Sequence, residues 1–198
     1  MMIEEILDFW FGSNPDDAVV AKEKSALWWS KNPRTDDEIR QRFANFVTKA
    51  AAGELSDWQS IPSGRLALIL LTDQFPRNIY RDSPRAFAYD AQALAWCLDG
   101  LDQGFDLKLR PIERVFFYLP LEHVESLEHQ DKSVTHFREL VSIADERCKS
   151  AFKEYLDFAI RHRDIIARFG RFPHRNQVLG RQSTPEELTF LSQPGSSF

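Results

Sequence analysis

The sequence predicts an all-α protein, and three observations lead to this fold class. Apolar residues recur at helical spacing along most of the 198 residues. Capping residues precede several of these stretches, and glycine or proline follows them. The alternation of apolar and polar residues that marks a half-buried strand is almost missing. We therefore expect antiparallel helix pairs joined by short connections, in a single domain that covers residues 1–198.

Capping signals place the helices of the first half. Gly12 stands where a helix C-terminal cap belongs, and Thr35 with Glu38 forms a capping box. Ser83 followed by Pro84 is an N-cap with proline at the first helical position. The stretch from 63 to 75 is apolar nearly all round, which predicts a central, buried helix. The expected helices cover 3–11, about 16–29, 35–52, 63–75 and 83–99, with Gly100 as the last stop.

The second half continues the pattern. Pro111 opens a short helix that Pro120 is expected to halt, and Ser126 caps the next one. A long helix is expected from about 145 to 168, ended by Gly170. Thr184 with Glu187 forms a last capping box. The tail 194–197 should be loose, although the terminal residue 198 could dock.

Composition narrows the class of protein. Hydrophobic residues make up 43%, with sixteen Phe and five Trp, which indicates a core of large rings. The net charge of −5 argues against nucleic-acid binding. The acidic start of the chain does not resemble a signal peptide, and the longest aliphatic run, 66–71, is too short to cross a membrane. With Cys97 and Cys148 far apart, we expect reduced thiols, a cytoplasmic protein and no cofactor.

Two short stretches repeat the order Phe-Pro, then Arg-Asn: DQFPRN at 73–78 and RFPHRN at 171–176. Proline fixes its own φ and disfavours the helical region for the residue before it. Each stretch should therefore be a rigid corner that presents Arg77 and Asn78, or Arg175 and Asn176. Such a pair suits recognition of a carboxylate or another anion. It equally suits capping of a neighbouring helix, and the sequence leaves both roles open.

Asp73 and Gln74 end a segment that is otherwise apolar. A buried carboxylate needs a partner, and Arg77 is one candidate. An Asp–Arg pair that ties down the helix end is the commoner role for such residues.

The segment from 121 to 131 holds four acids and no Lys or Arg. If this segment were helical, Glu122, Glu125 and His129 would share a face and could ligate a divalent metal. The spacing matches no established motif, so we expect no metal and a solvated acidic face instead.

The segment from 161 to 181 reverses the charge. It holds six arginines and two histidines, and Asp164 is its one acid. These arginines could neutralise the acidic segment at 122–131, or they could bind a phosphate or carboxylate ligand. The sequence does not decide between the two. It also contains no nucleophile elbow, phosphate-binding loop or dinucleotide fingerprint, so whether the protein is an enzyme stays open.

Four blocks of the chain resemble a known family: ILDFWFG at 6–12, LALILLTDQFPRNIYR at 66–81, FYLPLEHVE at 117–125 and RFGRFPHRNQVLGRQSTPEE at 168–187. They are similar to the uncharacterised bacterial family called domain of unknown function 924. The resemblance implies an all-α array of helix pairs, similar to tetratricopeptide-like superhelices, and implies no reaction. The chain departs from the family at Glu122, where an aromatic residue or Met is usual, which would add a charge at the edge of the site. The motif positions carried over are Asp73, Gln74, Arg77, Asn78, His123, Glu125, Arg171, His174, Arg175 and Asn176.

Three hypotheses for function follow. The first is a binding module for a small anionic metabolite or a peptide carboxylate, in a concave pocket with His123. The second is an enzyme on an anionic metabolite, with Asp73 or Glu125 as general base and His123 or His174 as partner acid. The third is a protein-interaction scaffold with an exposed apolar groove. The first hypothesis is preferred and sets no oligomeric state; its ligand-binding residues are Arg77, Asn78, Arg171, Arg175 and Asn176.

Overall fold

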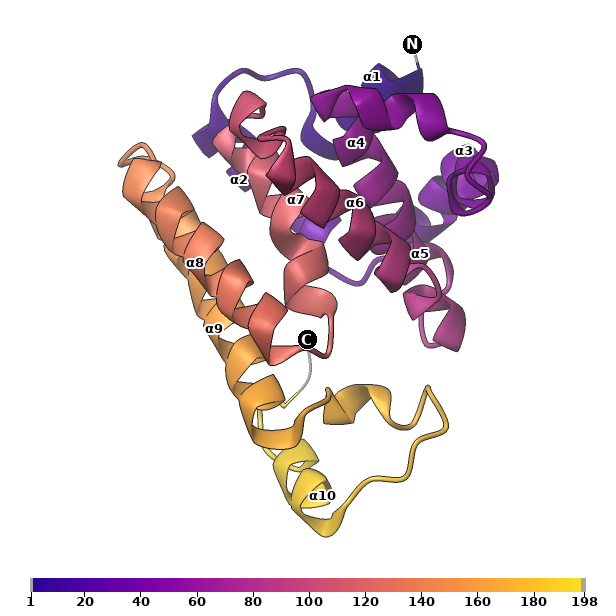
Figure 1. Ribbon diagram of the computed structural model, residues 1–198, viewed down its shortest axis with the longest axis vertical. Helices are drawn as coiled ribbons and strands as arrows, with labels where there is room; N and C mark the ends of the chain where they lie inside the picture. The colour runs from indigo at the N-terminus through magenta and orange to yellow at the C-terminus, as the bar shows by residue number, and fades with distance from the viewer. Residues whose placement is uncertain (1, 197–198) are drawn as a thin grey trace.

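The computed structural model describes residues 2–196, and across these residues it is built from helices with no strand (Figure 1). The all-α prediction is therefore confirmed, while the tetratricopeptide-like superhelix stays a prediction. The α-helices are α1 (Met2–Phe11), α2 (Asp17–Trp29), α3 (Pro33–Ala51), α4 (Pro62–Ile69), α5 (Phe75–Ile79), α6 (Asp90–Asp102), α7 (Pro111–His123), α8 (Leu127–Ile143), α9 (Lys149–Phe169) and α10 (Pro185–Leu191).

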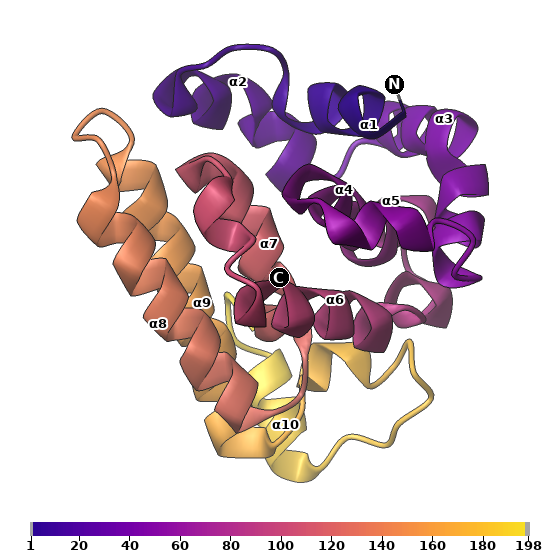
Figure 2. The same cartoon turned by 45° about the horizontal axis from the view of Figure 1, so that its top comes forward.

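Helices α8 and α9 form an antiparallel hairpin that lies along α7, as both views show (Figures 1 and 2). The helices before α7 gather on its other side. After α9, the segment from residue 170 to residue 191 runs out below α6 and returns through α10 toward the end of α9 (Figure 2). The outward run carries the second Phe-Pro motif, at residues 171–176, and places it below α6 (Figure 2).

Large rings from several helices build the main core. The Trp10 ring lies 5.4 Å from that of Phe75 and 5.5 Å from that of Phe116, and all three are buried. Burial of each such ring removes about 150–250 Å² of surface from water, so these contacts contribute strongly to the stability of the fold. The predicted central helix lies here, since every residue from 66 to 71 is fully buried. A smaller cluster of Ile165, Ile166 and Phe172 lies at the end of α9.

Pro120 does not halt a helix, contrary to the prediction. It lies inside α7, which continues to His123. Because proline has no N–H, α7 lacks one backbone hydrogen bond at this residue, at a cost of about 3 kcal/mol. Residues 115–121 are nevertheless buried on all sides of α7, so packing outweighs the lost bond.

Two capping predictions are also wrong. Helix α3 begins at Pro33 because Asn32 accepts a hydrogen bond from the Arg34 N–H (3.0 Å), so Thr35 is already inside the helix. Gly100 lies within α6, where a Cβ atom would come within 2.5 Å of the Phe117 ring and 2.6 Å of the Arg65 side chain. Gly100 is therefore required by the close approach of α6 to its neighbours and does not end the helix.

The end of the described chain is fastened to α9. Arg161 donates to the carbonyl of Gly195 (3.1 Å), and the Ser196 hydroxyl donates to the carbonyl of Leu191 (3.1 Å). The expected loose tail is thus held at these residues, whereas the expectation for residues 197 and 198 lies outside the described part. None of the helices in residues 2–196 has both the length and the apolarity that crossing a bilayer requires.

The Gly100 contacts predict an unusual response to a helix-favouring substitution. Gly100→Ala should gain about 1 kcal/mol of helix propensity and lose about 1–3 kcal/mol by overpacking against Phe117. We expect a net loss of stability in urea unfolding. A G100A protein more stable than wild type would show that the contact relaxes freely.

Candidate functional site

A π-helical turn, η2 (Leu70–Gln74), positions the first site residue. The N–H of Phe75 donates to the carbonyl of Leu70, five residues back. The corner predicted at the first Phe-Pro motif is therefore absent. The helix widens at η2 and continues into α5. The carbonyl of Asp73 accepts a hydrogen bond from Arg77 Nη1 at 2.7 Å. Single π-turns of this kind are common at functional sites.

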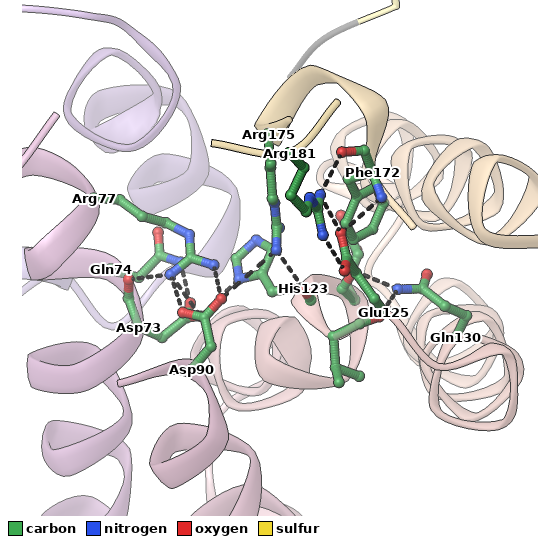
Figure 3. A network of polar contacts seen from close by, with 12 residues as sticks. Asp73, Gln74, Arg77, Asp90, His123, Glu125, Gln130, Phe172, Arg175 and Arg181 are labelled. Atoms are coloured by element: carbon green, nitrogen blue, oxygen red, sulfur yellow. Dashed lines mark hydrogen bonds and ion pairs between the residues drawn. The ribbon is translucent and has the colours of Figure 1, made fainter. Parts of the chain in front are cut away.

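Asp73 is fully buried (0% exposed) and points at His123, the last residue of α7 (Figure 3). Its Oδ1 lies 2.7 Å from His123 Nδ1 and 3.2 Å from Arg77 Nη1. Burial opposes the charge of this carboxylate, but Arg77 and His123 outweigh burial and hold the pKa of Asp73 well below its usual range. Asp73 is therefore an anion that accepts hydrogen bonds.

His123 is the neutral partner of this anion. Burial and the Arg77 guanidinium lower the pKa of His123, against the opposing effect of Asp73. A neutral imidazole next to a carboxylate carries its proton on the facing nitrogen. Nδ1 therefore donates to Asp73, and Nε2 keeps a lone pair that can accept a proton.

Arg77 forms ion pairs with two carboxylates. Besides Asp73, it binds Asp90 at the start of α6 through two parallel bonds, 2.8 Å from Nη1 to Oδ1 and 3.0 Å from Nη2 to Oδ2. The side chains of Arg77 and Asp90 remain 19% and 18% exposed, and that of His123 13%. Solvent therefore reaches one edge of the cluster, on the side of these three residues.

Arg175 completes the cluster from the other end of the sequence (Figure 3). It lies in the short turn η5 (Pro173–Arg175), after Gly170 in left-handed conformation has ended α9. Its Nη1 donates to the carbonyl of His123 at 2.9 Å, whereas the Oδ2 of Asp90 is 3.7 Å away. Arg175 is only 7% exposed. Burial and the nearby charge of Arg77 lower the pKa of Arg175 to about 10.

Glu125 holds the second Phe-Pro motif in place. One carboxylate oxygen accepts from the backbone N–H of Phe172 at 2.8 Å, and Arg181 binds both oxygens at 2.7 and 2.9 Å. The acidic segment 122–131 and the Arg-rich segment 161–181 therefore do pair, and Arg163 with Asp131 adds a second link at 2.9 Å. Glu125 is occupied by this structural contact.

Three predicted ligand-binding residues face other partners. Arg171 and Asn176 both donate to the buried Glu187 of α10, Arg171 at 2.6 and 2.8 Å and Asn176 at 3.2 Å. Asn78 donates to Asp36 of α3 at 2.9 Å. The structure thus brings together Asp73, His123, Arg77 and Arg175, and assigns the three others to braces between elements.

His174 lies beside this cluster, and its ring centroid is 5.6 Å from that of Phe172. Burial and Arg175 lower the pKa of His174 to about 4, so its imidazole is neutral near neutral pH. Sequence reasoning missed Asp90 and Phe87, the second of which ends the short helix η3 (Pro84–Phe87). An acid in the first turn of a helix is an ordinary feature, and nothing in the pattern singled out either residue.

Glu122 does not add a charge at the edge of the site, which is what its departure from the family pattern suggested. It is buried, and its Oε1 lies 3.0 Å from Nδ1 of His162 on α9. Burial, with a smaller effect from Asp73, raises the pKa of Glu122 to about 8. The residue is therefore neutral near neutral pH and adds no charge. The helical face that would join Glu122, Glu125 and His129 does not form, because α7 ends at His123 and α8 begins at Leu127.

The raised pKa of Glu122 predicts a pH dependence of stability. Between its ordinary 4.5 and about 8, the unfolded chain loses a proton that the folded protein keeps, so stability falls as pH rises through this window. The loss is at most about 1.4 kcal/mol per pH unit. Glu122→Gln removes this titration. The free energy of unfolding of E122Q should therefore increase relative to that of wild type as pH rises.

Urea unfolding of both proteins between about pH 5 and pH 8 tests this. The lowered pKa of His162 acts in the opposite direction and mainly below 6.5, and because Glu122 contacts His162, the comparison rests on the range from 6.5 to about 8. A difference that stays constant with pH would mean that Glu122 is ionised in the folded state.

Similar proteins agree with this architecture. The model of a bacterial protein family of unknown function, DUF924, matches residues 6–195. The solved structure of a protein of unknown function from Agrobacterium tumefaciens has 34% sequence identity and a TM-score of 0.82, over 96% of this chain and 97% of that one. No curated protein matches the sequence. Because the family model spans nearly the whole chain, the protein belongs to the bacterial DUF924 family.

Proposed function

We propose that the protein binds a small anionic ligand at Arg175, beside His123 and Arg77. One observation carries this proposal: Nε of Arg175 is buried and has no hydrogen-bond partner within the described chain. All contacts of this guanidinium to acceptors run through Nη1. The edge formed by Nε and Nη2 is the geometry that binds an oxyanion through two parallel bonds.

The energetics of a buried guanidinium support the proposal. An unsatisfied buried donor costs about 1–3 kcal/mol, and more when it is charged. The two carboxylates of the cluster do not relieve this cost. Asp73 is bound to Arg77 and His123, and Asp90 accepts its two hydrogen bonds from Arg77. An added anion would therefore meet a cation whose nearest carboxylate oxygen, Oδ2 of Asp90, is 3.7 Å away and forms no hydrogen bond with it.

The chemical class of the ligand follows from the donors. Arg175 offers charge and two N–H groups, which suit the carboxylate or phosphate of a metabolite, or the carboxylate of a peptide. The proposal includes a cytoplasmic setting, which fits the buried free thiols of Cys97 and Cys148. The scaffold hypothesis has no such observation in its favour and stays a prediction.

Substitution of Arg175 tests the binding role. Ligands would first be sought by thermal shift with a panel of metabolite anions. Arg175→Lys keeps the charge but removes the two-bond edge, so we expect about a tenfold to hundredfold loss of affinity in calorimetry. Arg85→Ala is the control, because Arg85 is exposed and its guanidinium lies over the ring of Tyr80, outside the cluster.

Circular dichroism would establish that R175K is folded. An R175K protein that is folded and binds every stabilising anion as tightly as wild type would refute the proposed site.

The Asp73–His123 pair favours a second candidate, an enzyme that moves a proton on an anionic substrate. The 2.7 Å contact fixes the tautomer that leaves Nε2 basic, and Arg175 lies next to His123 to hold the anion. This arrangement of carboxylate, imidazole and cation suits abstraction of a proton next to a carboxyl or carbonyl group.

Exchange of carbon-bound hydrogen for deuterium would reveal such proton transfer. We expect wild type to exchange a bound 2-oxo acid or another carboxylate in heavy water, and His123→Gln to be slower by about 100-fold to 10,000-fold. His129→Gln is the matched control, because the ring of His129 contacts Ser126 outside the cluster. Exchange that is equal in wild type and H123Q would exclude His123 as the base.

A further inference from the structure

We propose that the anion site at Arg175 selects a monocarboxylate over a phosphate, because two aromatic rings lie close against the guanidinium. This inference rests on the proposed function, since it concerns the ligand of the same site. It assigns a role in specificity to Phe87, which the sequence motifs do not include.

The two rings lie against Arg175 at short range. The guanidinium carbon is 4.7 Å from the ring centroid of Phe87 and 4.4 Å from that of Phe172. Phe87 also contacts Arg77, whose guanidinium carbon is 5.5 Å from the same centroid. Phe87 is therefore shared by the two cations of the cluster and is only partly buried.

Both rings are held in place by their own segments. Phe172 is fully buried, its N–H donates to Glu125 and its carbonyl accepts from Arg181 at 3.1 Å. Phe87 closes η3, which is capped by the Ser83 side chain. The aromatic walls are thus built by two separate parts of the chain and do not depend on a ligand.

The shape of the anion decides which ligand such a site accepts. A carboxylate is planar, so both oxygens can lie in the plane of the guanidinium. A phosphate is tetrahedral, so two of its oxygens lie above and below that plane when the other two bind the edge. The face of a phenyl ring carries negative charge density and repels oxyanions. Two phenylalanines this close to the guanidinium carbon therefore penalise the out-of-plane oxygens of a phosphate more than the two in-plane oxygens of a carboxylate.

The charge of the cluster acts in the same direction. Asp73 and Asp90 balance Arg77 and Arg175 in formal charge, and His123 is neutral. Each negative charge that a ligand brings is therefore in excess within a largely buried cluster. A carboxylate brings one such charge, whereas a phosphate near neutral pH brings up to two. The desolvation of a dianion is also the more costly.

Nuclear magnetic resonance of the Arg175 Nε–H group tests the inference directly on the full chain. Acetate, N-acetyl-dialanine and inorganic phosphate would be titrated separately at equal ionic strength. We expect acetate, or the peptide carboxylate, to shift this resonance with an affinity about tenfold above that of phosphate. Which of the two carboxylates binds more tightly distinguishes a metabolite site from a peptide site.

Phe87→Leu keeps an apolar side chain and removes the ring. In this variant the preference for carboxylate should fall from about tenfold toward parity, while the Arg175 resonance still responds. Phe46→Leu is the matched control, because Phe46 lies against Lys49 on α3 and not at the cluster. The ratio of carboxylate affinity to phosphate affinity in F46L should equal that of wild type.

The outcomes separate the two proposals. If phosphate shifts the Arg175 resonance as strongly as acetate, or if F87L keeps the full preference, the selectivity inference is overturned and the anion site stands. If neither the carboxylates nor phosphate shifts the resonance in wild type, the proposed function fails, and the inference fails with it.

Discussion

The ionised carboxylate of Asp73, fully buried between α7 and the start of α5, is the constraint on which the rest of the site depends. A buried charge is tolerated only when partners surround it. Here the partners come from α5 as Arg77 and from α7 as His123. Satisfying Asp73 therefore fixes the rotation of two helices relative to each other and sets the position of the carbonyl of His123, to which Arg175 binds.

A second constraint acts at the C-terminal segment. Glu125, just beyond α7, holds the backbone of Phe172 and the side chain of Arg181, and Glu187 of α10 binds Arg171 and Asn176. These charged contacts are of the strong, two-bond kind. They explain why so many Arg and Asn residues of the second motif are not free for a ligand. Their combined effect is to hold one further arginine, Arg175, over the end of α7.

The sequence predicted the helices well because capping and periodicity are local signals. It failed where tertiary contacts override them. Pro120 stays within a helix because its neighbours are buried. Gly100 leaves space for the ring of Phe117, which lies on another helix. For the site, the polar motifs singled out Asp73, His123 and Arg175, which the structure brings together. The partners that divert Asn78 and Arg171, namely Asp36 and Glu187, lie 42 and 16 residues away along the chain. Ordinary acids at such separations carry no signal in a single sequence.

The two arginines of the repeated motif show how one pattern can serve two purposes. Arg77 is part of a helix, is bound by two carboxylates and stabilises the fold. Arg175 is in a turn, its guanidinium carbon lies 4.7 and 4.4 Å from the ring centroids of Phe87 and Phe172, and its nearest carboxylate oxygen, on Asp90, is 3.7 Å away. The rings provide the favourable surroundings that keep an underpartnered cation in the interior, since a guanidinium stacks well on aromatic faces. Nε of Arg175 has no hydrogen-bond partner within the described residues, and a donor that folding leaves unused is one that a ligand can satisfy. The asymmetry between the two arginines, more than the motif itself, is therefore the argument for the anion site that we propose at Arg175.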